Sequence, residues 1–367
     1  MTKKNLLIYG AGAIGRGYLP WVFSPSDFNF YYVEANAKIR ALLRSHKSFT
    51  TYRTVGNQYE SMTVGVQACF EPGEETVMIQ QADVVATAVG PRNFFSLRPM
   101  LNQLSVPVIC CENDASLPAI MKEWTGNEKV VFAIPDVITS NTANKDLLNQ
   151  DPLAIITESG ECFIDQVVSD VPAACSYVSE NELAKQWAAK LYVHNTPHCI
   201  AAYLGSLLGL TYLHEAMENQ RASEIVEGAM DEMVAMLLTR PDMDRDFLKY
   251  YRNKELDRFR NQLLFDPITR VAREPFRKLA LDERLIGAAQ QCLAVGIMPH
   301  NILLGIMAAF CFDSEDDPDS HIKYLVKSLT PSEFLRTILR LRDNEALSLL
   351  LVDRWDSLLT QVKVLHK

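Results

Sequence analysis

The sequence has 367 residues, of which 48% are hydrophobic and 22% charged, with a formal net charge of −9. This length predicts two domains, and the acidic balance argues against a nucleic-acid-binding protein, which needs clustered lysine and arginine to neutralise phosphates. The eight cysteines contain no CxxC pair, so we expect reduced thiols in a cytoplasmic protein rather than disulfides or a zinc site. No apolar run is long enough for a secretory signal or a membrane span.

A short apolar strand at residues 6–9 leads into the run G-A-G-A-I-G. The glycines follow the GxGxxG spacing, in which the first permits a tight turn, the second a close approach to a pyrophosphate, and the third close packing of helix on strand. N–H groups of the following helix would then face the phosphates. The alternative is a glycine-rich turn without a ligand. The predicted cofactor contacts in this run are Gly10, Gly12, Ala13, Ile14 and Gly15.

A second strand, residues 30–35, brings Glu34 to about 20 residues beyond the last glycine, where a ribose-binding acid belongs. A carboxylate there would accept the ribose hydroxyls and repel a 2′-phosphate. The following Ala35, Asn36 and Ala37 supply no arginine to offset it. The cofactor predicted by this pattern is NAD rather than NADP.

Further β-rich segments follow at residues 82–90, 106–113, 130–140 and 153–168. In open α/β sheets, ligands bind outside the carboxyl ends of the strands. We therefore expect Val89 and Gly90 to pass over the cofactor, with Asn113 and Asp136 at the same crevice. Asn113 as a simple turn residue or helix cap is the alternative.

Helical patterns replace the strands from about residue 181. They span residues 181–193, 223–240, 282–296, 301–312 and 331–365. The fold class predicted is an α/β Rossmann-type N-terminal domain plus a mainly α-helical C-terminal domain. We place the NAD-binding domain at residues 1–185 and the substrate-binding, catalytic domain at residues 186–367.

The stretch KLYVHNTPHC places Lys190, Asn195 and His198 just before an apolar helix. A strand or loop carrying Lys190 and a helix capped by Thr196, with Pro197 in its first turn, would let the three polar side chains converge. A capped helix start with a solvated lysine is the alternative. Residues 258–285 are rich in arginine and are either a salt-bridged helix pair or a basic wall beside the active site.

Together these segments resemble the polyol-specific long-chain dehydrogenase/reductase (mannitol dehydrogenase) family, with its mannitol-phosphate branch the most similar. The resemblance rests on GAGAIGRG, TAVGP, CEN, KLYVHNTPHCIAAYLG and RVAREPFRKLALDERLI, which occur in the family's order over nearly the whole chain. The most specific element is K-x4-N-x2-H.

The resemblance implies a metal-free reaction with defined residue roles. Lys190 would be the general base, and Asn195 and Asn113 would bind the reacting oxygen. The implied substrate-binding residues are His198, Asp136, Arg270 and Lys278.

Three departures from the family pattern leave the substrate's phosphate open. Val137 stands where an arginine is usual, Pro197 replaces a glycine, and Ser206 replaces a lysine. Each change removes a charge or reshapes the rim of the pocket.

Oxidation of a secondary alcohol needs a hydride acceptor, a base and donors to the developing alkoxide. A free lysine has a pKa of about 10.4, and burial or nearby cations bring such an amine toward neutral pH. The resemblance implies that the reaction interconverts mannitol 1-phosphate and fructose 6-phosphate with NAD(H). Alternatives are a free-polyol dehydrogenase, a fructuronate or tagaturonate reductase, and a non-catalytic NAD(H)-binding regulator. The protein is expected to be a monomer or homodimer, without nucleic-acid or membrane partners.

Overall fold

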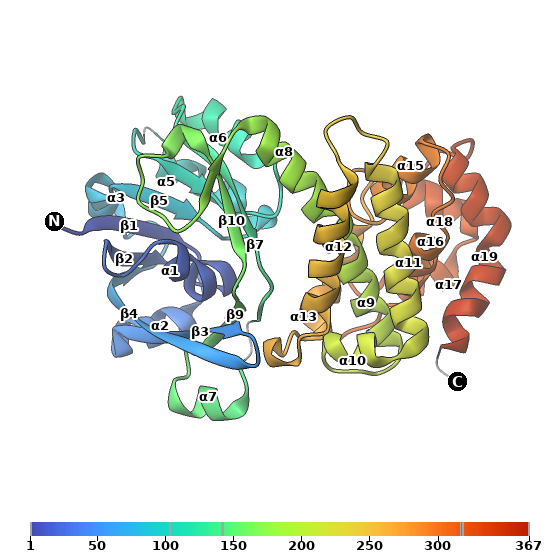
Figure 1. Ribbon diagram of the computed structural model, residues 1–367, viewed down its shortest axis with the longest axis horizontal. Helices are drawn as coiled ribbons and strands as arrows, with labels where there is room; N and C mark the ends of the chain where they lie inside the picture. Colours follow the sequence, from blue (N-terminus) through green and yellow to red (C-terminus); the bar gives the residue numbers. More distant parts are fainter. Residues whose placement is uncertain (1, 103, 141–142, 316, 318, 366–367) are drawn as a thin grey trace. The chain divides into compact units, whose positions relative to one another are not determined.

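The computed structural model describes residues 2–365 except 103, 141–142, 316 and 318. The chain divides into two compact units, residues 1–187 and 188–367. The first is built on a β-sheet and the second on helices (Figure 1). Within the described ranges, none of the helices combines the length and apolar character that crossing a membrane requires.

The sheet of the first unit has a parallel centre, because β7, β6, β5, β1, β2 and β4 pair in parallel in that spatial order. Antiparallel partners join it at either side, with β10 on β7 and β3 on β4. In spatial order the strands are β11 (Ser176–Val178), β10 (Glu161–Asp165), β7 (Val130–Asp136), β6 (Val108–Cys110), β5 (Val84–Thr87), β1 (Lys4–Tyr9), β2 (Phe28–Val33), β4 (Gln58–Phe70), β3 (Ser48–Val55), β9 (Ile155–Glu158) and β8 (Thr139–Ser140).

Both faces of this sheet are buried, as expected for parallel strands covered on two sides. Along β1, Leu6 and Ile8 pack into one apolar core, while Leu7 and Tyr9 pack into the other. This alternation follows from the two-residue period of a strand. The helices of the unit are α1 (Leu19–Val22), α2 (Ala37–His46), α3 (Thr76–Gln81), α4 (Pro91–Phe94), α5 (Arg98–Leu101), α6 (Leu117–Thr125), α7 (Lys145–Gln150) and α8 (Glu180–Ala189).

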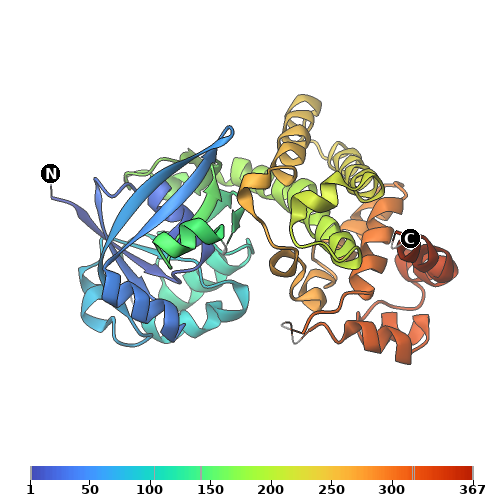
Figure 2. The same cartoon turned by 90° about the horizontal axis from the view of Figure 1, so that it is seen from below.

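A long antiparallel hairpin, β3–β4, was not among the predicted elements. Figure 2 shows its two blue strands running together to a tight turn, where Val55 pairs with Gln58. Gly56 occupies the turn with a φ of 56°, a left-handed conformation that glycine adopts at little cost. The sequence signal was weak because the outer half of the hairpin is polar on both faces.

The second unit is a helical assembly around α9 (Thr196–Leu207), whose side chains are buried from Thr196 to Gly205. Helix α9 packs against α10, α11, α13 and α16. The remaining helices are α10 (Leu213–Glu218), α11 (Gln220–Leu237), α12 (Arg245–Phe259), α13 (Ile268–Ala272), α14 (Pro275–Lys278), α15 (Ile286–Ala294), α16 (His300–Phe310), α17 (Ile322–Ser328), α18 (Pro331–Thr337) and α19 (Ala346–Val364).

The prediction of one continuous helix over residues 331–365 is wrong. Helix α18 ends at Thr337, and α19 begins only at Ala346. Between them Arg340 has a φ of 59°, a left-handed conformation that cannot continue a right-handed helix. The N–H of Leu341 donates instead to the carbonyl of Leu335.

Candidate active site

The glycine-rich turn follows β1 and is held close to the end of β5. Gly10 has a φ of 93°, and a Cβ built on it would lie 2.5 Å from the carbonyl oxygen of Ala88. A Cβ on Gly15 would lie 1.9 Å from the oxygen of Gly10. Apart from Gly12 and its two chain neighbours, no heavy atom of the described residues lies within 4 Å of the Cβ position of Gly12. Two glycines therefore close the turn, and the middle one leaves its backbone open to a ligand.

The turn continues into a π-helical segment, η1 (Ala13–Tyr18), before α1 begins. The predicted helix therefore starts with a widened turn. Single π turns are rare and occur often at functional sites. Ala13 and Ile14 are half-buried and Gly15 is buried.

Glu34 follows the last residue of β2, with a side chain directed back toward the glycine turn. One carboxylate oxygen accepts the N–H of Ala11 at 2.7 Å and the other accepts the N–H of Asn36 at 2.7 Å. Each oxygen retains a second lone pair that can accept a ribose hydroxyl. A neighbouring cation, Arg40, was not among the predicted site residues. Its guanidinium donates to the carbonyl of Glu34 and pairs with Glu71 at 3.3 Å.

A buried carboxylate, Glu112, joins the ends of β5 and β6. It accepts the hydroxyl of Thr87 at 2.7 Å and the N–H of Val89 at 3.1 Å. Burial raises the pKa of Glu112 to about 7. Gly90 follows with a φ of 84°, and Asn113 is half-buried immediately after Glu112.

Parallel pairing brings all the predicted cofactor residues to one edge of the sheet. Strands β1, β2, β5, β6 and β7 run in the same direction, so their carboxyl ends share that edge. The last residue of β7 is Asp136, whose side chain is buried. The predicted residues beyond these strand ends are Gly10, Gly12, Ala13, Ile14, Gly15, Glu34, Val89, Gly90 and Asn113.

The second unit places the K-x4-N-x2-H element in a helix. The helix predicted over residues 181–193 is therefore confirmed, and the strand or loop considered for Lys190 is wrong. Helix α8 runs directly into a π-helical segment, η4 (Lys190–Asn195), which runs directly into α9. Hydrogen bonds from residue i to i+5 bring Lys190 and Asn195 one above the other on the same side. Both side chains are largely buried, at 8% and 5% exposure.

Thr196 does not cap a helix start, since the helix is already formed before it. Its hydroxyl donates to the carbonyl of Arg284 at 2.7 Å, which fixes the segment before α15 to α9. The predicted capping motif thus serves as a tertiary contact instead.

Two buried hydrogen-bonded networks of polar side chains lie around this part of α9. His198 Nε2 donates to Asp266 at 3.0 Å, and the Asp266 carboxylate also accepts from Arg270 Nε at 2.8 Å. Burial lowers the pKa of His198, which keeps its ring neutral near pH 7. Burial alone would raise the pKa of Asp266, but Arg270 and His198 hold it below its usual range.

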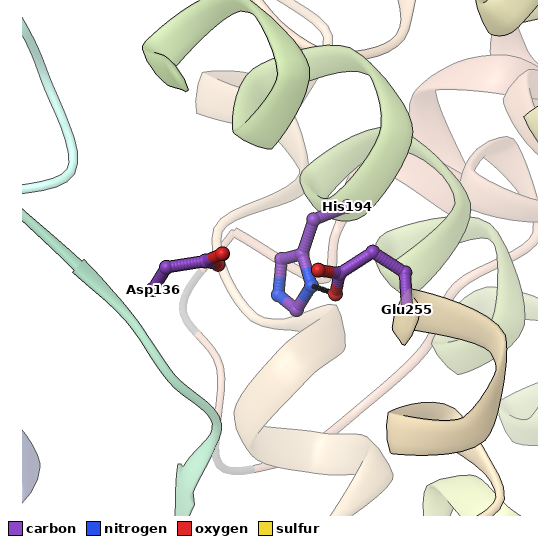
Figure 3. Close-up of side chains that lie close together, drawn as sticks. All are labelled: Asp136, His194 and Glu255. Atoms are coloured by element: carbon purple, nitrogen blue, oxygen red, sulfur yellow. Dashed lines mark hydrogen bonds and ion pairs between the residues drawn. The ribbon is translucent and has the colours of Figure 1, made fainter. Parts of the chain in front are cut away.

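The second hydrogen-bonded network links His194 to Glu255, as Figure 3 shows. His194 Nδ1 donates to the Glu255 carboxylate at 2.5 Å, and Arg258 donates to the same carboxylate. The two imidazole rings lie 4.9 Å apart, and His198 stacks on the ring of Phe259 at 5.1 Å. The apolar ring of Phe259 therefore packs between the two hydrogen-bonded networks.

Most arginines of the basic segment form ion pairs. Arg277 contacts Glu274 at 2.7 Å and Glu283 at 3.0 Å, and Arg284 contacts Glu283 at 2.9 Å. The salt-bridged interpretation therefore describes much of this segment.

Two cations of the segment differ from these. Arg273 is exposed and Lys278 is buried, and neither pairs with a carboxylate among the residues that the structure describes. The ammonium of Lys278 donates to the carbonyl of Arg273. Burial and the neighbouring Arg277 and Arg284 lower the pKa of Lys278 well below its ordinary value.

Comparison with known proteins identifies the family. A family model for the mannitol dehydrogenase Rossmann domain matches residues 4–129, and one for the mannitol dehydrogenase C-terminal domain matches residues 183–345. A mannitol-1-phosphate 5-dehydrogenase of Brevibacillus brevis is 30% identical, with 85% of this chain and 87% of that protein covered. The chain belongs to the mannitol dehydrogenase family. It is therefore a dehydrogenase.

Two further similarities extend over nearly the whole length. A mannitol-1-phosphate 5-dehydrogenase of an Exiguobacterium species is 27% identical, covering 95% of this chain and 96% of that protein. The fold matches that of Pseudomonas fluorescens mannitol 2-dehydrogenase, solved as a ternary complex with NAD and D-mannitol. That match has a TM-score of 0.75 and 15% identity, covering 99% of this chain and 92% of the other. Both units of this mannitol dehydrogenase family member thus have the family's architecture.

Sequence reasoning missed several polar residues of this family member, including Glu112, His194, Glu255 and Asp266. Glu112 and His194 each stand directly beside a predicted site residue, which was the one available signal. Glu255 and Asp266 lie 61 and 68 residues from their histidine partners, so no local pattern could have paired them.

Replacing Asp266 by asparagine should lower the free energy of unfolding at pH 7 by about 3 kcal/mol, because it leaves a buried partner unpaired. Since the folded-state pKa of Asp266 lies below its unfolded value, its stabilisation is present above about pH 3.9 and lost as pH falls through the folded value. Urea unfolding at several pH values measures this difference. The control, Asp242→Asn, removes an exposed partner of Arg240 and should cost less than about 1 kcal/mol. Equal losses from the two variants would contradict a stabilising role for Asp266.

Proposed function

We propose that this dehydrogenase uses NAD(H) to interconvert mannitol 1-phosphate and fructose 6-phosphate. The observation that carries the proposal is the match over most of the chain to two curated mannitol-1-phosphate 5-dehydrogenases, together with the glycine turn and Glu34 at one edge of the sheet. In this proposal the first unit, residues 1–187, binds the cofactor, and the second, residues 188–367, binds the substrate.

The residues at the sheet edge fit a dinucleotide. The open backbone at Gly12 admits a pyrophosphate, and the lone pairs of Glu34 suit two ribose hydroxyls. Bound NAD⁺ supplies the hydride acceptor. Glu34 disfavours a 2′-phosphate by charge, and Arg40, which donates to the carbonyl of Glu34, is already paired with Glu71.

Lys190 is the proposed base. Its neutral amine takes the proton of the substrate's carbinol hydroxyl, and in the reverse direction its ammonium returns it. Asn195, in the same π-helical turn, donates its amide to the reacting oxygen, and Asn113 has the same role by family resemblance. Amide donors do not titrate, so they stabilise the developing alkoxide over the whole working pH range.

His198 and its carboxylate orient the substrate. Because Nε2–H donates to Asp266, the neutral ring keeps Nδ1 as an acceptor for a substrate hydroxyl. Arg270 holds the same carboxylate in place from the other side and can share its remaining N–H donors with the substrate. Asp136 at the end of β7 is the proposed acceptor for another hydroxyl.

In this proposal Arg273 and Lys278 bind the phosphate, since among the described residues neither of these two basic side chains pairs with a carboxylate. A phosphate would supply the anion that these groups lack. Val137, where the family usually has an arginine, packs into the apolar core of the first unit. The presence of valine in place of the family's arginine therefore does not by itself remove a charge from the substrate pocket.

Lys190→Ala should lower kcat by at least the roughly 10²–10⁴-fold typical of a general base while leaving NADH binding nearly unchanged. Steady-state kinetics and NADH fluorescence titration measure the two effects. The control is Lys249→Ala, which removes an exposed lysine of α12 and should retain full activity. A Lys190→Ala enzyme with over half the wild-type kcat would rule out Lys190 as the base.

The wild-type enzyme should prefer NADH to NADPH, and Glu34→Gln should reduce that preference at least tenfold, a change of about 1.4 kcal/mol. The single oxygen of glutamine can accept only one of the two N–H groups, of Ala11 and Asn36, that the carboxylate accepts. The neutral side chain no longer repels a 2′-phosphate. The measurement is the ratio of kcat/KM for the two cofactors with the same ketose. Equal use of both cofactors by the wild type would show that Glu34 does not set the preference.

The kcat/KM for fructose 6-phosphate should exceed that for fructose by at least about tenfold. Arg273→Gln and Lys278→Met should each shrink this ratio more than they slow fructose reduction, because each removes a cation without a carboxylate partner. Arg240→Gln, which removes an exposed, paired arginine, is the control and should leave the ratio unchanged.

Equal efficiency on the two ketoses would exclude the phosphate assignment. The enzyme would then be a free-polyol dehydrogenase or a uronate reductase. Parallel assays with fructuronate and tagaturonate distinguish these alternatives. Absence of turnover on all four substrates, with NADH still bound, would favour a non-catalytic regulator.

A further inference from the structure

Glu112 is a buried acid without a cationic partner. Glu112 is only 3% exposed. In the described part of the chain, no lysine or arginine forms an ion pair with its carboxylate. Its two oxygens accept from Thr87 and Val89. Buried charges in proteins are normally paired, so this carboxylate lacks the counter-charge that its ionised form requires.

The titratable groups facing Glu112 do not supply that charge. Among the described residues, those that interact electrostatically with it are the thiol of Cys110 on β6 and the carboxyl of Asp114 on the following loop. Burial keeps the Cys110 thiol neutral by raising its pKa, and Asp114 adds a negative charge. Burial, reinforced by Asp114, brings the pKa of Glu112 to about 7, so the carboxyl can change charge under ordinary conditions.

Glu112 lies on the side of the sheet edge where the nicotinamide end of the cofactor would bind. Strands β5 and β6 lie on the side of β1 opposite β2, which carries Glu34. With the ribose at Glu34 and the pyrophosphate at the glycine turn, the nicotinamide lies toward β5 and β6. Glu112 holds Val89 at that end and directly precedes Asn113. The nicotinamide ring carries one positive charge in NAD⁺ and none in NADH.

We propose that Glu112 senses the redox state of the bound nicotinamide, being ionised when NAD⁺ is bound and protonated when NADH is bound. This rests on the proposed function, because it requires NAD(H) at this sheet edge. When NAD⁺ binds, the carboxyl releases a proton to solvent. When hydride transfer removes the ring's charge, the carboxylate takes up one proton from solvent. The hydroxyl proton of the substrate goes separately to Lys190.

The hydrogen bonds of Glu112 accommodate both charge states. As a carboxylate it accepts from Thr87 and Val89. When protonated, its O–H can donate to the Thr87 hydroxyl, while its other oxygen still accepts the N–H of Val89. Protonation of Glu112 therefore reverses the direction of its hydrogen bond with Thr87 without breaking the contact between β5 and β6. Glu112 acts through charge and position and does not touch the reacting oxygen.

The test is the number of protons released on cofactor binding, measured by titration calorimetry in buffers of different ionisation enthalpy. Lys190→Met is the parent protein, since the proposed base could also release a proton. At pH 6.5 a carboxyl with a pKa of about 7 is mostly protonated, so NAD⁺ should release roughly half a proton or more and NADH far less. NAD⁺ affinity should rise as pH increases through this range, while NADH affinity should not.

Adding Glu112→Gln should abolish the proton release on NAD⁺ binding, because glutamine preserves the contacts but cannot titrate. Glu75→Gln is the matched control, since Glu75 is 1% exposed and bonded to Tyr9 and Gly73; this variant should release protons like the parent. Undiminished release in the Glu112→Gln protein would overturn the proposal.

The parent protein provides a second test that does not depend on the folding of any Glu112 variant. Equal pH dependence of NAD⁺ and NADH affinity in the parent would also overturn the role of Glu112. Failure of the parent to bind either cofactor would instead refute the proposed function, and the redox-sensing role with it. The two failures are thus distinguished by whether binding is observed at all.

Discussion

The parallel hydrogen bonding of β1 to β2 and β5 is the constraint on which the Rossmann-type unit of this dehydrogenase depends. Parallel strands present their carboxyl ends at one edge, so residues far apart in the chain come together there. The glycine turn, Glu34, Val89 and Asn113 each follow a different strand and owe their proximity to this pairing. Packing requires it too, because the alternating side chains of β1 enter two separate cores.

Two π-helical turns widen the backbone at the chain's two most informative motifs. One follows the glycine turn, and the other holds Lys190 and Asn195. In the second, the five-residue spacing of the motif matches the i to i+5 hydrogen bonding of a π turn. A regular α-helix would rotate these two side chains apart. The motif spacing and the unusual backbone thus have one explanation.

Buried charge is treated in two ways in this molecule. Asp266 and Glu255 are each held by a histidine and an arginine, which satisfies them within the fold. Within the described residues, Glu112 and Lys278 are buried without an ion pair, and burial displaces their pKa values toward the neutral form. In the function and the redox role proposed above, a cationic nicotinamide and an anionic phosphate are the complementary ligands. Under those proposals, incomplete pairing marks where ligand charge enters, whereas complete pairing marks structural support.

The sequence by itself determined the features that depend on local spacing. These include the glycine turn after β1, the acid after β2, the helical second half and the K-x4-N-x2-H element. Only the tertiary structure decided that Lys190 lies in a π turn, that Thr196 contacts Arg284, and that residues 331–365 form two helices. It also decided which acids support the histidines, since Glu255 and Asp266 reach them across 61 and 68 residues. Local patterns record hydrogen bonding within a turn or strand, whereas charge pairing is set by which distant segments pack together.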